Sequence, residues 1–481
     1  MKIDTKLKPT DLTRKLARFW ELSGAKIHDI EEHYDVRKGS PVFTIRGKYT
    51  ARGWTEWTQG FQYGAAILQF DATGDADLLE VGRRNTVAKM APHVSHFGVH
   101  DHGFNNVSTY GNLLRLQNEG RLPANEWERN FYELALKCSG AVQARRWTKI
   151  QNGGYIYSFN GPHSLFVDTI RSCRALAVGH KLGHAILEEN DRRVSLLDRL
   201  KQHGLATARY SVFYGVNRDA YDIRGRVTHE AIFNTNDGNY RCPNSQQGYS
   251  PFSTWTRGLA WAMLGFAEQL EFLRSIGDRE VTAEFLKAAQ ATCDFYIDHA
   301  TALDGIPYWD TGAPLLHKLG DWQSRRSNPY NPHEPIDSSA AAIAAQGLLR
   351  LGHYLGSPKS QAGSPQSPVS SPKSRSLRTQ DSRLRTQDSG PRTQDSARRY
   401  WQAGLTVLNT LLDEPYLSTN AKHQGLILHS VYHRPNGWDY IPAGQKIPCG
   451  ESSMWGDYHA REAALYVQRV ADQKPYLTFW S

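Results

Sequence analysis

Helical runs that open with the same short motif limit the fold of this sequence more than any other feature. One run follows residues 57–60 (WTQG) and ends at a turn at 73–75, and a second follows 255–258 (WTRG) and ends at 277–278. In both runs the apolar side chains recur at helical spacing. Repeated helix–loop–helix units with polar and aromatic residues at the helix starts predict a toroid of helical hairpins.

Other segments fit this architecture. Asp337 is expected to cap an Ala-rich helix, and the last helix is expected from Asp457 onward. Strand-like runs are short and lie at 153–159 and 425–433. A toroid of about twelve helices with their loops needs roughly 350 residues. The 481-residue chain therefore has room for one all-α domain of this kind.

One segment, 357–398, differs from the rest in composition. It is rich in Ser, Pro and Arg, and RTQDS recurs at Arg378, Arg385 and Arg392 without any apolar seam. Because it holds few apolar residues, burial cannot offset its ordering entropy. We predict a disordered insertion, a neutral expansion rather than a phosphorylated or RNA-binding tail, within one catalytic domain made of 1–356 and 399–481.

Composition excludes several classes of protein. With 40% hydrophobic and 22% charged residues, the chain is neither a disordered polymer nor a small disulfide scaffold. No apolar run is long enough to span a membrane, and the charged start of the chain lacks the apolar region of a signal peptide. The five cysteines are scattered without a CxxC pair, so we expect a reduced, cytoplasmic protein.

A formal net charge of +9 raises the question of a nucleic-acid partner. The 357–398 segment alone holds eight Lys and Arg residues against three Asp. The basic character is therefore largely a property of that segment, and no nucleic-acid-binding motif accompanies it. We expect neither a nucleic-acid nor a membrane partner.

Four histidines and Asp101 fall within residues 93–102. Such a cluster resembles a metal site, but it contains no HExxH or facial-triad pattern and no cysteine. We therefore expect no bound metal and no cofactor, with the histidines hydrogen-bonded in a loop. A further interpretation makes Asp101 an acidic site residue, with Gly103 leaving room for a ligand.

Two further patterns could carry chemistry. Asp168 follows apolar residues and precedes a helical run, which is typical of an N-cap but also of a general acid whose pKa is raised by apolar surroundings. Farther along, Arg257 lies between Trp255 and Trp261, behind a Gln-Gly loop, where a guanidinium could clamp a carboxylate. The tryptophans alone could equally belong to a core.

Several motifs in a fixed order give the chain a family resemblance. They are WTQGFQYG (57–64), HDHGF (100–104), VDT (167–169), QGYSPFSTWTRGLAWAMLGFA (247–267), GIPYWDTGAP (305–314), DSSAAAIAAQGLL (337–349) and GDYHAREAAL (456–465). Together they resemble the unsaturated glucuronyl hydrolases of glycoside hydrolase family 88, from about residue 20 to 470 apart from the insertion.

The resemblance implies an (α/α)6 barrel, a six-hairpin toroid, and a glycosidase of EC 3.2.1 type. Enzymes of this family remove a 4,5-unsaturated uronate from the non-reducing end of lyase-made oligosaccharides. They hydrate the C4=C5 vinyl ether rather than attack the anomeric carbon, so the spacing rule for paired glycosidase carboxylates does not apply.

By matching position, the resemblance implies that Asp168 is the general acid/base and Asp101 its partner, whose charge would help keep Asp168 protonated. The matching substrate-binding positions, which would orient the C5 region, bind the carboxylate or stack on sugar rings, are His229, Gln247, Arg257, Trp57, Trp255 and Trp261.

The sequence departs from the family at two places. Tyr157 and Phe159 stand where a Trp often precedes the catalytic Asp, and Ile170-Arg171-Ser172 replaces a Met-Met-Asn-like run. The related unsaturated rhamnogalacturonyl hydrolases, which share the reaction but tend to carry RGNGW at 257–261, are the second candidate. A carbohydrate-binding barrel without catalysis is the third. The sequence predicts neither the polysaccharide, its sulfation, nor the oligomeric state.

Overall fold

The computed structural model describes residues 1–53, 56–357, 390–475 and 478–479. The part of the predicted insertion that spans 358–389 lies outside these residues. No helix in the described part is long and apolar enough to cross a membrane.

Helices form an inner ring. Along the chain each inner segment contacts the next, and the last, α15, contacts the first, α2, so the ring closes. The ring consists of α2 (Gln59–Thr73), α5 (His102–Asn105) with α6 (Asn112–Asn118), α8 (Thr169–Ser172) with α9 (Arg174–Lys181), α11 (Thr256–Ser275), α13 (Ser338–Gly356) and α15 (Met454–Ala471). A π-helical stretch, Val107–Gly111, joins α5 to α6.

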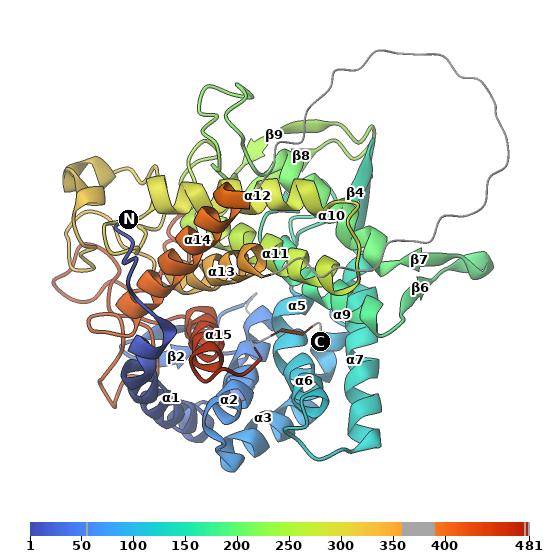
Figure 1. Cartoon of the computed structure of the whole chain (residues 1–481), viewed down its shortest axis with the longest axis horizontal. Helices are drawn as coiled ribbons and strands as arrows, with labels where there is room; N and C mark the ends of the chain where they lie inside the picture. Colours follow the sequence, from blue (N-terminus) through green and yellow to red (C-terminus); the bar gives the residue numbers. More distant parts are fainter. Residues whose placement is uncertain (54–55, 358–389, 476–477, 480–481) are drawn as a thin grey trace.

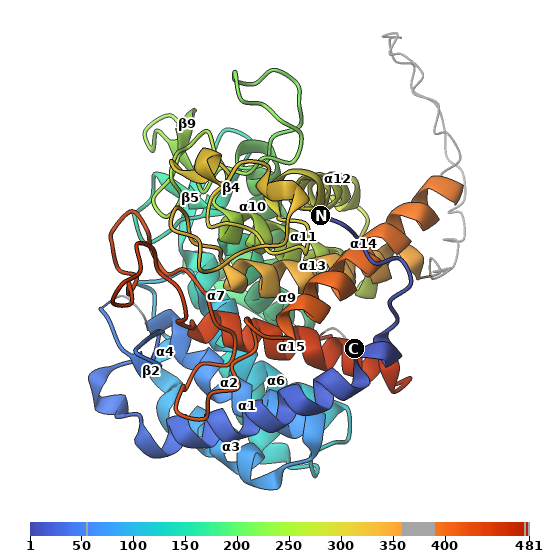
Figure 2. The ribbon, with the colours of Figure 1, turned by 90° about the vertical axis from the view of Figure 1, so that its left-hand side faces the viewer.

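Outer helices alternate with the inner ones along the chain and pack against them. They are α1 (Thr13–His33), α3 (Ala76–Lys89), α7 (Glu126–Arg145), α10 (Leu196–Tyr210), α12 (Thr282–Phe295) and α14 (Gly390–Leu411). Figures 1 and 2 show α1 and α3 at the periphery with α15 inside them. A short helix, α4 (Ala91–Val94), follows α3. The predicted (α/α)6 barrel is confirmed.

Inner helices are buried on all sides, which explains their continuous apolar and small-residue sequences. In α11 every residue from Thr256 to Leu273 is buried. The charged side chains inside the ring are paired, as burial requires. Arg171 contacts Glu462 at 2.9 Å and Glu268 at 3.1 Å, and Arg174 contacts Glu462 at 3.2 Å.

Short antiparallel strands lie in the connections between the helices of the barrel. They are β1 (Phe43–Ile45), β2 (Lys48–Thr50), β3 (Trp147–Ile150), β4 (Gly153–Ile156), β5 (Ser164–Phe166), β6 (Ala185–Leu187), β7 (Arg193–Ser195), β8 (Glu230–Phe233) and β9 (Tyr240–Asn244). β5, β8 and β9 form one three-stranded sheet, and the others pair as hairpins. In the sheet Phe166 pairs with Glu230, and the Val167 amide donates to the His229 carbonyl at 3.0 Å. This register places Asp168 beside His229.

The predicted helix boundaries are largely confirmed. α2 ends at Gly74, which has the left-handed conformation that favours glycine, and Asp337 caps α13 by accepting hydrogen bonds from the amides of Ser339 and Ala340. The last helix begins at Met454, before the predicted Asp457, because Ser453 is its cap.

Two predictions are wrong, one of a strand and one of a boundary. The run 425–433 is not a strand: the Asp457 carboxylate accepts the amides of Leu426 and Ile427 at 2.8 Å, and only Ile427 bridges to Leu417. Backbone pairing with 416–418 is limited to the carbonyl of Leu426 and the amide of Leu428, and two amides of the run go to a side chain instead. The boundary of the insertion at 398 is too late, because α14 begins at Gly390 and Ala397 is buried.

Candidate active site

A cavity of about 530 Å³, the site cavity, lies where the inner helices begin. Its walls come from the starts of α2, α5, α8 and α11 and from loops beside them. The lining residues are Trp57, Val99, His100, Asp101, Phe104, Phe159, Asn160, Asp168, Gln246, Gln247, Trp255, Arg257, Trp261, Tyr432, His433 and Trp438. All predicted site residues except His229 line it, and His229 lies directly behind Asp168.

Asp168 occupies the N-cap position of α8, but its side chain makes no capping hydrogen bond. Its Oδ2 accepts from Nε2 of His100 at 3.1 Å. Its Oδ1 is buried without a hydrogen-bond partner among the described residues and lies 3.8 Å from Nε2 of His229. The carboxylate therefore has one anchored oxygen and one oxygen that is unsatisfied.

His100 lies between two carboxylates. Its Nε2 is 3.7 Å from Asp101 Oδ1 as well as 3.1 Å from Asp168. Burial lowers the pKa of His100, but Asp101 and Asp168 outweigh burial and leave that pKa raised. Burial raises the pKa of Asp168. The hydrogen bond from His100 and the charges of His100 and His229 lower it by more, so the pKa of Asp168 is lowered overall.

Asp101 has the opposite shift. Burial raises the pKa of Asp101 to about 6, with His100 acting against the shift and Asp168 adding to it. The expectation that a second carboxylate keeps Asp168 protonated is therefore wrong for the unliganded protein. Because His100 pairs more closely with Asp168, the first proton that the carboxylate pair takes up as the pH falls toward 6 goes to Asp101.

The glycine after Asp101 has a structural purpose. A Cβ at Gly103 would lie 2.1 Å from the carbonyl oxygen of Ser172, so glycine is needed for α5 to approach α8. The suggestion that Gly103 leaves room for a ligand is not supported. The close approach of the two short helices is what brings Asp101 near Asp168.

The histidine cluster does not converge on one point. His102 bonds to Ser139 and to the His96 carbonyl, away from the cavity. Only His100, with Asp101 and Asp168, places ligand atoms within 4.8 Å of one another, among the residues that the structure describes. A cation could be held there, although His100 already donates to Asp168.

His229 is neutral at physiological pH, because burial lowers its pKa to about 4. Its Nδ1 accepts from the amides of Gln246 at 3.0 Å and Gln247 at 3.4 Å. The proton of the neutral ring is therefore on Nε2, the nitrogen that faces Asp168. That Nε2 is buried and has no hydrogen-bond partner in the described part of the chain.

Both terminal nitrogens of Arg257 contact other groups of the protein. Nη1 contacts Asp337 at 3.3 Å and donates to the Val431 carbonyl, and Nη2 donates to the carbonyl of Tyr432 at 2.7 Å and to Gln247 Oε1 at 3.1 Å. These four contacts use all four Nη hydrogens. Arg257 thus fixes the loop at 431–432 and turns the amide nitrogen of Gln247 away from itself.

The three predicted tryptophans differ in exposure. Trp255 and Trp261 are 3% and 2% exposed, so very little of either ring is accessible from the site cavity. Trp57 is half-buried and stacks on Trp455 with 5.1 Å between ring centroids. Trp255 and Trp455 also flank the Arg257 guanidinium at 4.6 and 4.8 Å from its carbon.

Several lining residues were missed by sequence reasoning. His100 was not distinguished from three neighbouring histidines, although it is adjacent to Asp101 in sequence. Tyr432 and His433 lie in the run that was assigned to a strand. Asn160 and Trp438 come from loops, for which no periodic pattern exists, whereas Phe159 was named only as a departure from the family.

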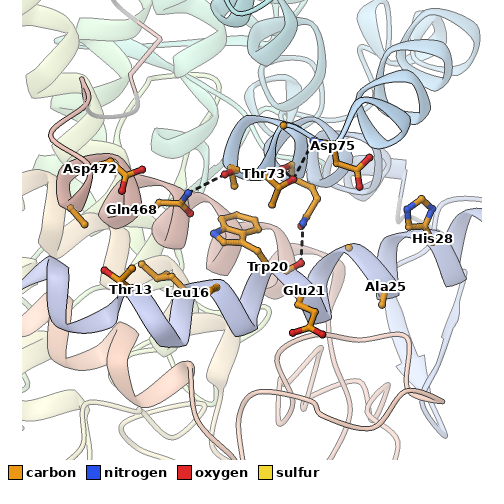
Figure 3. A pocket seen from close by; sticks show the side chains of 16 residues that line it. Thr13, Leu16, Trp20, Glu21, Ala25, His28, Thr73, Asp75, Gln468 and Asp472 are labelled. Atoms are coloured by element: carbon orange, nitrogen blue, oxygen red, sulfur yellow. Dashed lines mark hydrogen bonds between the residues drawn. The ribbon is translucent and has the colours of Figure 1, made fainter.

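A second hollow, of about 800 Å³, lies at the opposite end of the barrel, between α1 and the C-terminal ends of α2 and α15 (Figure 3). Glu21, Asp75 and Asp472 line it. Carboxylates and helix C-termini both repel anions. This hollow is therefore unsuited to an anionic sugar such as a uronate.

No protein-family model matches the chain. It is 25% identical over 432 residues to the unsaturated glucuronyl hydrolase of Bacillus sp. (strain GL1), covering 88% of this chain and 89% of that protein. It is 23% identical over 441 residues to the unsaturated chondroitin disaccharide hydrolase of Streptococcus pyogenes serotype M1, covering 90% of this chain and 86% of that protein.

Solved structures resemble the whole fold. An unsaturated glucuronyl hydrolase from Streptococcus agalactiae superposes with a TM-score of 0.68 at 18% identity, covering 100% of this chain and 95% of that one. An unsaturated glucuronyl hydrolase specific for heparin gives 0.67 at 18% identity, covering 97% and 99%. By sequence over most of its length and by fold, the chain is a distant relative of the unsaturated glucuronyl hydrolases.

Proposed function

We propose that the protein is an unsaturated glucuronyl hydrolase. It removes a 4,5-unsaturated uronate from the non-reducing end of lyase-generated oligosaccharides by hydrating the C4=C5 vinyl ether. The observation that carries the proposal is the pair formed by Asp168 Oδ1 and His229 Nε2 beside the site cavity. Both atoms are buried, they lie 3.8 Å apart, and neither has a hydrogen-bond partner among the residues that the structure describes.

The pair suits a reaction in which one carboxyl group both gives and takes a proton. Protonated Asp168 donates its proton to C4, which leaves oxocarbenium character on C5 and the ring oxygen. Water adds to C5, and Asp168 takes a proton from that water. The resulting hemiketal opens, and the aglycone leaves as an alcohol, so no second nucleophile is required.

Substrate binding supplies the protonated form of Asp168. In the unliganded protein Asp101, whose pKa is raised to about 6 by burial, takes up a proton before Asp168, whose pKa is lowered. A bound uronate adds a negative charge and displaces water, and both effects raise the pKa of Asp168. Asp101 then serves as the nearby proton source, within 4.8 Å.

The uronate carboxylate is proposed to lie toward the start of α11. A helix N-terminus carries partial positive charge and favours an anion. The amide nitrogen of Gln247, turned away from Arg257 by the 3.1 Å bond to its Oε1, is a donor for that carboxylate. Trp57 offers the half-buried aromatic face on which a sugar ring can stack.

We also propose a reducing, cytoplasmic location and a single catalytic unit. All five cysteines are free, which is typical of a reducing compartment. The catalytic unit is proposed to be one domain, made of the sequence on both sides of the Ser-, Pro- and Arg-rich segment, with α14 included.

A substrate panel tests the function. Purified protein is added to lyase-made disaccharides from glycosaminoglycan, ulvan and pectic polymers, and the absorbance of the 4,5-ene is followed at about 232 nm. Loss of the band with at least one glucuronyl substrate supports the proposal. Turnover of the pectic substrate alone would favour the rhamnogalacturonyl class, and binding by calorimetry without turnover would favour a non-catalytic barrel.

A further inference from the structure

The loop at 245–249 carries groups that the proposed chemistry needs. It lies between β9 and α11 and forms neither a helix nor a strand. The amides of Gln246 and Gln247 donate to Nδ1 of His229 at 3.0 and 3.4 Å. The proton of the neutral ring is therefore on Nε2, which faces Asp168. Because no helix or strand holds the loop, other contacts must keep these two amides in place.

Asp310 provides such a contact. Its Oδ2 accepts the amide of Tyr249 at 2.8 Å, and its Oδ1 accepts the amide of Gly312 at 2.8 Å. A Cβ at Gly248 would lie 2.9 Å from Oδ2, so glycine allows the loop to close over the carboxylate. The backbone of Asp310 is itself fixed, because it forms a β-bridge with Trp255 at the start of α11. The carboxylate thus connects the loop to the end of an inner helix.

The carboxylate of Asp310 is buried without a cation. The residue is fully buried and has no ion-pair partner among the described residues. Burial raises its pKa to about 6, and the hydrogen bonds from Ser253, Gly312 and the Tyr249 amide act against that rise. The charge of Glu334 adds to the rise. A buried carboxylate of this kind costs stability and is typical of functional sites.

We propose that Asp310 is a positioning residue for the hydration reaction and acts on His229 through the loop at 245–249. The inference rests on the proposed function. By holding the loop, Asp310 keeps two amides on Nδ1 of His229 and so keeps the Nε2 proton directed at Asp168. The ring cannot follow a displaced loop, because it packs against Phe166 with 4.2 Å between ring centroids. Without the anchor, Nδ1 loses its donors and competes for the proton.

The state of the histidine ring tests the contact without any substrate. Nitrogen NMR of the full chain, isotope-labelled in its histidines, gives the Nδ1 resonance of His229, which is identified by its loss in His229→Gln. Asp310→Ala removes both acceptor oxygens and should move this resonance toward that of a nitrogen without a donor. Asp304→Ala is the matched control and should leave the resonance in place. Asp304 is also buried and accepts the amide of Ser327 at 3.1 Å, but it lies outside the site cavity.

A second variant displaces the loop without removing the carboxylate, in case Asp310→Ala does not fold. In Gly248→Ala the new Cβ would lie 2.9 Å from Asp310 Oδ2 and 2.6 Å from Ser245 Oγ, so the loop must move away. The His229 resonance should shift in this variant as well. A resonance that stays in place in the folded variants, or that moves equally in Asp304→Ala, would overturn the proposal.

Kinetics tests whether the contact reaches catalysis. Asp310→Ala should lower kcat about tenfold, because the ring of His229 remains but its proton is no longer fixed. Since both residues act through one ring, the double variant His229→Gln/Asp310→Ala should have the kcat of His229→Gln alone. Losses of kcat that multiply would show that Asp310 acts independently of His229, against the proposal. A wild type without turnover would refute the proposed function, whereas the ring resonance would still decide whether Asp310 fixes His229.

Discussion

Oδ1 of Asp168 and Nε2 of His229 lie 3.8 Å apart, and neither has a hydrogen-bond partner in the described part of the chain. Burying two polar atoms without partners costs free energy, of the order of 1–3 kcal/mol for each. Such a cost is tolerated where a water or substrate atom completes the contacts. The pair therefore marks the point at which the proposed reaction takes place.

His229→Gln should lower kcat by about a hundredfold, because the Nε2 donor facing Asp168 is lost. The ring is neutral, so this residue should contribute no inflection to the pH profile above about pH 5. His203→Gln is the matched control: His203 is also buried, and its Nδ1 accepts a backbone amide, but it lies outside the site cavity. Equal losses of kcat in both variants would contradict the assignment.

His100→Gln should move the alkaline limb of the kcat/KM profile upward by roughly one pH unit. Glutamine can still donate to Asp168, but it lacks the positive charge that lowers the pKa of that carboxyl group, so the protonated form persists to higher pH. His102→Gln, whose ring bonds to Ser139 instead, should leave the limb in place. An unchanged profile in His100→Gln would show that its charge does not control Asp168.

Asp101→Asn should stabilise the protein at pH 8 by up to about 3 kcal/mol while impairing catalysis. Burial raises the pKa of Asp101 from 3.8 to about 6, so its ionised form is disfavoured in the folded state. The stability that it contributes is present below pH 4 and is lost as pH rises through 6. Denaturation at pH 4.5 and pH 8 checks this, and an equal change in stability at both pH values would contradict it.

Arg257→Lys should raise KM about tenfold and destabilise the protein by about 3 kcal/mol, because a lysine cannot make the four Nη contacts to Asp337, Gln247 and the loop at 431–432. Arg274→Lys, at the other end of α11, is the control, and its KM should not change. Kinetics and thermal denaturation measure both effects. An unchanged KM in Arg257→Lys would show that the loop is held by other contacts.

Helix periodicity and capping predict the long inner helices well, because these helices are rich in apolar and small residues and are buried on nearly all sides. α2, α11 and α13 begin and end close to the residues that the sequence indicates. The run 425–433 shows the limit of such patterns. Its short apolar runs resemble a strand, but the carboxylate of Asp457 accepts the amides of Leu426 and Ile427, and that contact cannot be read from local sequence.

For the candidate site, too, the sequence predicts which residues take part but not their contacts. Motifs identify Asp101, Asp168 and Arg257, but not what each side chain contacts. Only the fold selects His100 from the four histidines of 93–102, and with it which of the two carboxylates takes up a proton first. Likewise, the sequence suggests Arg257 as a carboxylate clamp, whereas its Nη atoms bind the protein itself.

Asp168→Asn is the most direct test of the account. The side chain does not cap α8, so the variant should fold like the wild type. With a disaccharide that the wild type turns over, the rate of absorbance loss at about 232 nm should fall by two to four orders of magnitude, about the contribution of a general acid/base. Calorimetry should still detect binding of that disaccharide. A variant that retains full activity would contradict the central claim that Asp168 transfers the proton to C4.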